Sequence, residues 1–129
     1  MEIVVVTHGE MSIGLMNSCN MYYGKLDNVH PICLLPDMSI EEFKRDFYEF
    51  MDSLGERILV LCDIEGGTPF NTACEYNKNS EKEIAIITGV NLPMLIDSID
   101  RLREDGKLIN VSNDIIIDTI SGIKLITTK

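Results

Sequence analysis

The sequence has little positive charge, no long apolar segment and no cysteine pattern typical of a metal site. Lysine and arginine total 11 against 21 aspartates and glutamates, which gives the 129-residue chain a formal net charge of −10. This balance argues against binding to nucleic acid, which needs a basic footprint, and against docking on an anionic membrane. No apolar run approaches the ~20 residues that a membrane-spanning helix requires.

The cysteines Cys19, Cys33, Cys62 and Cys74 show neither a CxxC motif nor a Cys/His metal-ligand spacing. We therefore expect reduced thiols, no metal and no cofactor. The chain enters an apolar run directly, without the basic stretch of a signal peptide, and this predicts a cytoplasmic protein. Its length suits a single domain that covers residues 1–129.

Strand and helix patterns alternate along the chain, as is typical of βαβ units around a parallel sheet. Continuous aliphatic runs, such as Ile3–Val6 and the stretch within Arg57–Asp63, indicate central strands that are buried on both faces. We predict a doubly wound, mostly parallel α/β fold. The predicted strands cover about residues 3–6, 29–34, 57–63 and 83–88, and the predicted helices about residues 11–23, 40–54, 68 onward and 91–104.

Three local patterns refine this prediction. Pro31 lacks a backbone donor, which places the strand around it at the edge of the sheet. Ser39 followed by Glu42 forms a capping box at the start of a helix. Residues 111–120 have the propensity of a strand, but their flanking residues favour a short helix followed by a last strand at about Ile123–Thr127.

His8 is the first candidate functional residue. It directly follows a buried strand, and Gly9 allows the sharp turn into the next helix. The carboxyl ends of the strands form the edge of an open α/β sheet at which ligands bind. A lone histidine is more often an ordinary surface residue, so the remaining loops at this edge decide its role.

Asp63 begins the second loop at this edge, Asp63-Ile64-Glu65-Gly66-Gly67-Thr68-Pro69. The two glycines allow the backbone to approach a ligand closely, and Thr68 is a candidate N-cap with Pro69 at the first helical position. A helix start of this kind favours an anion. The loop lacks the spacing and the lysine of a Walker A motif, and the chain contains no GxGxxG, so a nucleotide is not expected.

His8 and Asp63 would lie on adjacent central strands. The carboxylate would accept a hydrogen bond from one imidazole nitrogen, which leaves the other nitrogen as a nucleophile. The helix starts after Gly9 and at Thr68 would then surround a phosphoryl group on that nitrogen.

Three motifs together resemble the enzyme IIA domain of the mannose/sorbose-type sugar phosphotransferase system. They are Thr7-His8-Gly9, the loop Asp63–Asn71 and Gly89-Val90-Asn91-Leu92-Pro93-Met94, and the resemblance covers nearly the whole chain. It implies that His8 is the phosphorylated histidine, that Asp63 orients it and that Thr68 lies near the phosphoryl group, where Gly9, Gly66 and Gly67 would also contribute.

The resemblance also implies partners. Similar proteins accept phosphate from the carrier protein HPr and pass it to a IIB component that serves a membrane IIC/IID permease. They form homodimers in which the last strand, here Ile123–Thr127, crosses to the neighbouring subunit. Glu10 and Glu65 depart from relatives that carry apolar residues there, and we expect both to point outward, towards a basic surface of HPr. His30 matches no motif and is expected to be structural or exposed.

Two alternatives rest on other folds of the same class. Asp63 at the end of a third parallel strand resembles the phospho-acceptor of a response-regulator receiver, but that fold needs an acidic pair where this chain has Thr7-His8. A flavin-binding module of flavodoxin type would need a loop rich in Ser and Thr after the first strand, and that loop is missing. Purified protein without yellow colour would exclude the flavin-binding alternative.

Overall fold

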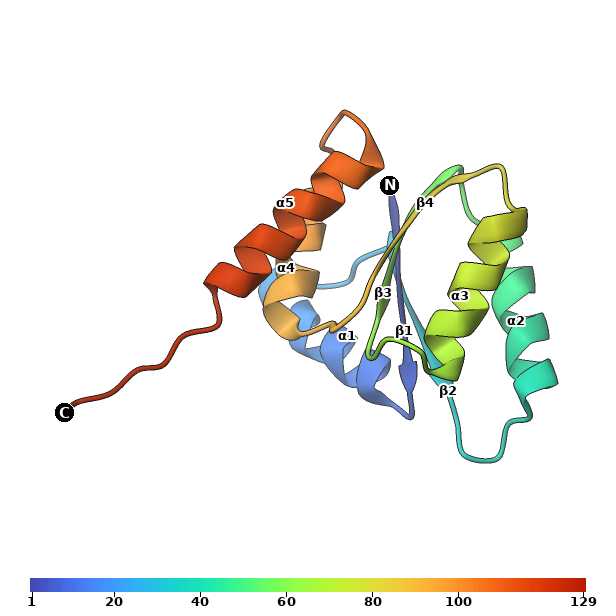
Figure 1. Cartoon of the computed structure of the whole chain (residues 1–129), viewed down its shortest axis with the longest axis horizontal. Helices are drawn as coiled ribbons and strands as arrows, with labels where there is room; N and C mark the ends of the chain where they lie inside the picture. Colours follow the sequence, from blue (N-terminus) through green and yellow to red (C-terminus); the bar gives the residue numbers. More distant parts are fainter.

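The computed structural model describes all residues, 1–129, as strands and helices in regular alternation followed by a final helix (Figure 1). The strands are β1 (Glu2–His8), β2 (Val29–Leu34), β3 (Arg57–Cys62) and β4 (Glu83–Ile87). The helices are α1 (Met11–Tyr23), α2 (Ile40–Ser53), α3 (Thr68–Asn79), α4 (Leu92–Asp100) and α5 (Leu108–Ser121).

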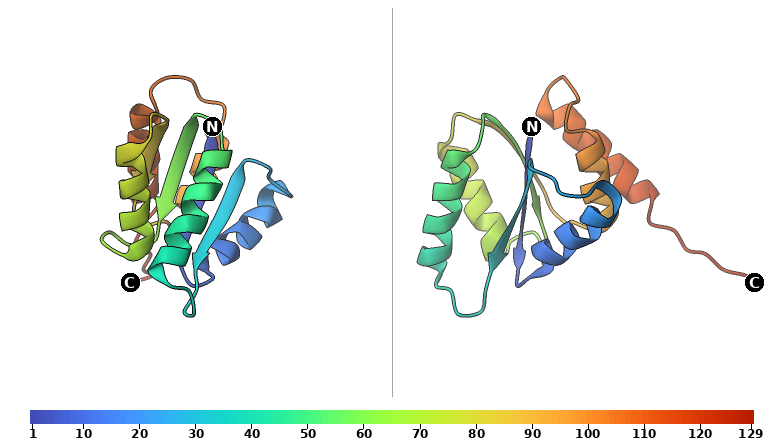
Figure 2. Two further views of the ribbon diagram at one scale, coloured as in Figure 1. Left: turned by 90° about the vertical axis from the view of Figure 1, so that its right-hand side faces the viewer. Right: turned by 180° about the vertical axis from the view of Figure 1, so that it is seen from behind.

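The four strands form one parallel sheet in the order β2-β1-β3-β4. Helices α2 and α3 cover one face of the sheet, and α1, α4 and α5 cover the other (Figures 1 and 2). The predicted doubly wound α/β fold is therefore confirmed. Pro31 lies in the edge strand β2, as its missing backbone donor predicts.

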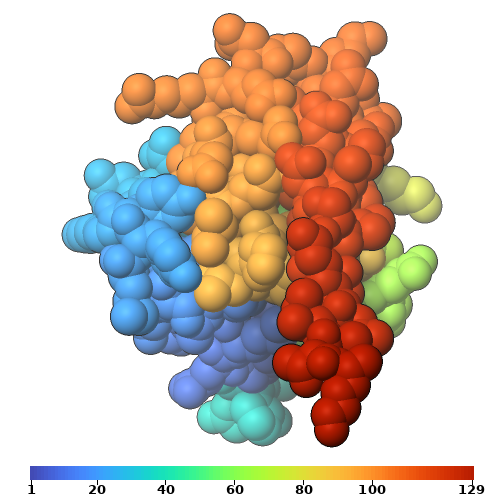
Figure 3. Space-filling model, turned by 90° about the vertical axis from the view of Figure 1, so that its left-hand side faces the viewer, coloured from blue at the N-terminus to red at the C-terminus, as the bar shows by residue number.

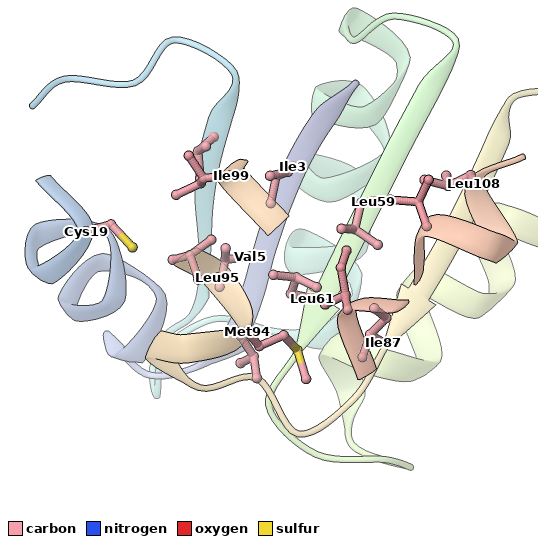
Figure 4. Close-up of a cluster of buried hydrophobic side chains, with 14 residues drawn as sticks. Ile3, Val5, Cys19, Leu59, Leu61, Ile87, Met94, Leu95, Ile99 and Leu108 are labelled. Atoms are coloured by element: carbon pink, nitrogen blue, oxygen red, sulfur yellow. The ribbon is translucent and has the colours of Figure 1, made fainter. Parts of the chain in front are cut away.

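Successive residues of the central strands alternate between two cores. Ile3 and Val5 of β1 pack with Leu59 and Leu61 of β3 beneath α1, α4 and α5 (Figure 4). The residues between them face α2 and α3, where Phe43 and Phe47 are fully buried. This burial on both faces explains the continuous aliphatic runs of β1 and β3, because neither face of these strands meets water.

Helix ends largely follow the local residue types. The capping box at α2 is present, because the Ser39 hydroxyl accepts from the Glu42 N–H and the Glu42 carboxylate accepts from the Ser39 N–H, both at 3.1 Å. Gly24 ends α1 with a φ of 70°. At α3 the prediction was wrong by one residue: Gly67 is the N-cap, Thr68 is the first helical residue, and no side chain caps the helix.

The C-terminal part differs most from its prediction. Helix α4 ends at Asp100 rather than at residue 104, and the helix predicted at residues 111–120 begins earlier, at Leu108. The strand predicted at Ile123–Thr127 does not form within this chain. Residues 123–129 belong to no element and extend away from the domain, past the face made by α1, α4 and α5 (Figures 1 and 3). None of the helices has both the length and the apolar character needed to cross a membrane.

Candidate functional site

His8 is the last residue of β1, and Asp63 directly follows the neighbouring strand β3. The two strands pair in parallel, with Val6 opposite Cys62, so both side chains emerge at the carboxyl edge of the sheet. Valine and isoleucine fill the preceding positions of β1 and keep that strand buried up to Thr7. The sheet thus fixes where the two functional groups emerge.

One carboxylate oxygen of Asp63 binds His8 twice. Oδ2 accepts the main-chain N–H of His8 and also contacts the ring nitrogen Nδ1, each at 2.8 Å. The other oxygen, Oδ1, accepts the N–H of Ile64 at 2.9 Å. Because the carboxylate is an acceptor, Nδ1 carries the proton of the neutral ring, and Nε2 is left with its lone pair.

The environment of Asp63 favours the charged carboxylate. Burial alone would raise the pKa of Asp63, but the hydrogen bonds from the His8 N–H, the His8 ring and the Ile64 N–H outweigh burial and lower it. Asp63 is therefore ionised more readily than an ordinary aspartate. Its side chain is only 12% exposed, whereas the His8 side chain is 45% exposed and Nε2 makes no hydrogen bond to the protein.

This geometry argues against the receiver alternative. A phospho-acceptor carboxylate must present an oxygen to the incoming phosphoryl group, but both oxygens of Asp63 are engaged by His8 and Ile64. The accessible nucleophile at this edge is the imidazole instead.

Two glycines act on His8 for different physical reasons. Gly9 has a φ of 59°, a conformation that favours glycine, and its N–H donates to the Leu34 carbonyl of β2 at 2.8 Å. Gly67 has ordinary dihedral angles, but a Cβ atom at this position would lie 2.7 Å from Cε1 and 3.3 Å from Nε2 of His8. Gly67 is therefore required by the close approach of the imidazole ring to the backbone.

The remaining predicted residues lie around this pair. Gly66 has a φ of 82° and directly precedes Gly67. Thr68 occupies the first position of α3, partly exposed, and its hydroxyl makes no hydrogen bond within the chain. Because Thr68 is not the N-cap, this hydroxyl is available to a ligand. Glu10 and Glu65 are exposed and make no ion pair.

The third loop, residues 88–94, supports the site without hydrogen bonding to His8. The N–H of Gly89 donates to the main-chain carbonyl of Asp63 at 3.1 Å, and the Val90 N–H donates to that of Cys62 at 3.0 Å. The Asn91 side chain caps α4 by accepting from the Met94 N–H. This loop therefore holds the backbone that carries Asp63, a role that its sequence alone did not indicate.

His30 lies outside this site. Its Nε2 is 2.9 Å from Glu2 Oε2, and its ring packs edge-on against Phe50 with centroids 5.2 Å apart. His30 is the second residue of β2, whereas His8 is the last residue of β1. His30 therefore lies towards the amino ends of the parallel strands, and His8 lies at their carboxyl ends. No group of three or more His, Cys, Asp or Glu side chains is arranged to hold a metal ion.

Comparisons with known proteins agree on one family. The family model EIIA-man, described as PTS system fructose IIA component, matches residues 2–109. The fructose-specific EIIA component of Bacillus subtilis (strain 168) is 27% identical over 116 residues, which cover 88% of this chain and 78% of that protein. The mannose-specific EIIAB component of Escherichia coli (strain K12) is 29% identical over 98% of this chain, and the chain spans only 40% of that longer protein.

Solved structures of phosphotransferase system components share the fold of this chain. Phosphotransferase system component EIIA from Streptococcus agalactiae superposes with a TM-score of 0.89 and 26% identity, over 96% of this chain and 95% of that one. A mannose/sorbose-specific IIA subunit from Enterococcus faecalis has the same fold, with a TM-score of 0.87, 19% identity and coverage of 99% and 96%. The chain belongs to the EIIA-man family and is an EIIA component of the sugar phosphotransferase system.

Proposed function

We propose that the chain is a phosphocarrier that accepts a phosphoryl group from phospho-HPr on Nε2 of His8 and passes it to a IIB component. The observation that carries this proposal is the 2.8 Å contact between His8 Nδ1 and Asp63 Oδ2. It fixes the tautomer and directs the lone pair of Nε2 towards solvent at the carboxyl edge of the sheet.

The reaction needs little beyond positioning. The lone pair of Nε2 attacks phosphorus while the N–P bond of phospho-HPr breaks, and the leaving histidine takes that electron pair. One N–P bond replaces another, so the exchange is nearly thermoneutral and the protein mainly aligns the groups and excludes water. As the ring gains positive charge on bonding to phosphorus, the ionised Asp63 stabilises it through Nδ1–H.

The start of α3 would hold the transferred group. Helix N-termini present free N–H groups and a partial positive charge, which suit the phosphoryl oxygens. In this chain α3 has no side-chain cap, and its first turn begins at the glycine that faces the His8 ring. Gly9, Gly66, Gly67 and the Thr68 hydroxyl would complete the phosphoryl-binding site.

The surface around His8 suits basic protein partners with apolar contacts. Three apolar side chains are exposed here, at 43%, 37% and 56%: Met11 at the start of α1, Leu35 in the loop after β2 and Ile64 in the loop after β3. Glu10 and Glu65 are exposed in the loops that follow β1 and β3, add negative charge there and are free to pair with basic residues of HPr. The IIB component would use the same face, and through it the protein would serve a membrane IIC/IID permease from the cytoplasm.

In the proposed homodimer, a second copy would cover the apolar surface beside the edge strand β4. A groove of about 600 Å³ runs between β4 and α5, and its lining includes Ile84, Ile86 and Ile116. Strand β4 has no neighbour on this side, and unpaired strand edges accept a further strand. The extended segment Ile123–Thr127 of a second copy is our candidate for that strand.

The proposed function is tested by incubating the purified protein with phosphoenolpyruvate, enzyme I and HPr, and then mapping the labelled residue. We expect label on His8 that depends on HPr, is labile to acid and survives alkali, as is typical of phosphohistidine. Adding a IIB component should then remove the label. Absence of label, or label on a residue other than His8, would refute the proposal.

A further inference from the structure

We propose that Asn71 is a positioning residue for phosphoryl transfer, and that it holds the Gly66–Gly67 peptide so that the Gly67 N–H can bind the phosphoryl group on His8. This inference rests on the proposed function and assigns a role to a residue that makes no hydrogen bond to His8. Asn71 lies in the first turn of α3 and is exposed to solvent.

Asn71 binds the loop before its helix at two points. Its side-chain Nδ2 donates to the Gly66 carbonyl at 3.1 Å, and its main-chain N–H donates to the Gly67 carbonyl at 2.9 Å. The second bond is the ordinary first bond of a helix. The first bond is specific to the asparagine side chain, and it acts on the peptide unit that joins the two glycines.

The bond at the Gly66 carbonyl determines the direction of the Gly67 N–H. The two groups belong to one peptide unit, which is planar and trans, so they point in opposite directions. Because the carbonyl points to Asn71, the N–H points away from it. This N–H has no hydrogen-bond partner within the chain, and an unpaired backbone donor at a functional site is available to a ligand.

The backbone of Gly67 also lies close to the reacting atom. A Cβ on Gly67 would be only 3.3 Å from His8 Nε2, so the backbone of Gly67 directly faces the nitrogen that we propose to be phosphorylated. A phosphoryl group on Nε2 would bring its oxygens within reach of this N–H, which would favour the charge that develops during transfer.

The peptide needs to be held because both of its flanking residues are glycines. Glycine occupies positive and negative φ with similar ease, and Gly66 already has a φ of 82°. Without the Asn71 side chain, the peptide between two such residues can rotate and turn its N–H away from the site. Loss of one hydrogen bond of this kind corresponds to a decrease in transfer rate of about tenfold.

The variant Asn71→Ala tests the proposal, and Asn79→Ala is its matched control. Asn79 belongs to the same helix, is also exposed, and its Nδ2 donates to a main-chain carbonyl, that of Glu75, at 3.0 Å. Both variants lose one exposed side-chain hydrogen bond of α3. We expect nearly equal thermal unfolding temperatures, but only Asn71→Ala should slow phosphorylation by phospho-HPr, by about tenfold.

Amide NMR gives a readout that a purely structural role would not change. In the wild-type protein the Gly67 amide proton should shift downfield when His8 is phosphorylated, because it gains an anionic acceptor. In Asn71→Ala that shift should become smaller, whereas in Asn79→Ala it should stay at the wild-type size.

Two results would overturn the inference: wild-type transfer rates in Asn71→Ala, or a Gly67 amide that does not respond to phosphorylation of the wild-type protein. Failure of the proposed function itself looks different. In that case the wild-type protein would take no label on His8, and the labelling experiment on the wild-type protein alone would reveal this failure.

Discussion

Asp63 binds His8 through a single oxygen, Oδ2, which lies 2.8 Å from the main-chain N–H and 2.8 Å from the ring nitrogen Nδ1. The backbone contact fixes the position of the residue, and the ring contact fixes its orientation and tautomer. Because both contacts use one oxygen, the imidazole plane is set relative to the end of its own strand. The side chain that we propose to be phosphorylated is thus held by a residue at the end of the adjacent strand, although it is 45% exposed.

Replacing the nucleophile should abolish phosphate acceptance without unfolding the protein. His8→Ala removes a side chain that is largely outside the core, so its unfolding temperature should remain close to that of the wild type. Labelling by phospho-HPr should fall to background. His30→Ala is the control, because this histidine contacts Glu2 and Phe50 instead of the site, and it should label normally.

Asp63→Asn should slow transfer and leave the acceptor in place. Asparagine can offer either an oxygen or an NH₂ group to Nδ1, so the reactive tautomer is held less reliably, and the charge that stabilises the phosphorylated ring is lost. A decrease of roughly 10²-fold or more follows from the larger losses seen when a triad aspartate is neutralised. Rates are compared in single-turnover labelling.

The exposed carboxylate Asp105 supplies a control for the loss of charge, since Asp105→Asn should transfer at the wild-type rate. The same variant of Asp63 distinguishes the two possible acceptors. Complete loss of label in Asp63→Asn, together with an alkali-labile adduct on the wild-type protein, would identify Asp63 as the acceptor and contradict our assignment.

The depressed pKa of Asp63 predicts how stability depends on pH. Burial opposes the charged form, but the bonds from His8 and Ile64 lower the pKa below that of the unfolded chain. The unfolded state therefore binds more protons in this range, and the stabilisation is fully present above the unfolded pKa of about 4. It is lost as the pH falls through the folded pKa.

Thermal unfolding measured from pH 7 to pH 2 tests this dependence. The wild-type protein should exceed Asp63→Asn in unfolding temperature at pH 7, and the difference should shrink below pH ~4 as Asp63 becomes protonated. A difference that grows on acidification would mean that the sign of the pKa shift is wrong.

The sequence was sufficient to predict the sheet and the proximity of His8 and Asp63 at its carboxyl edge. Buried parallel strands must be apolar throughout, so the point at which Ile3–Val6 gives way to His8, and Arg57–Cys62 to Asp63, marks where each strand ends. Residues at the ends of adjacent parallel strands are neighbours, so the residue types at these ends predict which functional groups lie together.

Other features depend on contacts that no local pattern encodes. Gly67 has ordinary backbone angles, and its need to be glycine comes only from the His8 ring that packs against it. Helix α5 was uncertain because its isoleucines suit a strand by propensity, whereas burial of Val111 and Ile115 against the sheet selects a helix. The tail that follows it finds no partner within its own chain.

Gly67→Ala should impair transfer by displacing the nucleophile. The added Cβ would lie 2.7 Å from Cε1 of His8, a distance that requires the ring or the loop to move. A displacement of the reacting atoms by about 1 Å costs up to ~10²-fold in rate. Gly55→Ala is the matched control, because nothing lies within 4 Å of its added Cβ. Equal rates for the two variants in the phospho-HPr assay would show that the ring does not pack on Gly67 in the working protein.

In the homodimer that we propose, deleting residues 123–129 should leave a monomer and lower the unfolding temperature. Ile123, Leu125 and Ile126 are 72%, 90% and 81% exposed, and a chain rarely leaves three such side chains in water on one short segment. Strand β4 offers a free edge beside the groove along α5, and an exchanged strand would pair backbone groups there and bury these side chains. The deletion leaves α5 intact, since that helix ends at Ser121.

Sedimentation equilibrium measures the mass of the truncated protein. The control is Met21→Ser, which removes an 88%-exposed side chain of α1 and should remain dimeric. A truncated protein that sediments as a stable dimer would show that the tail is not the exchanged strand.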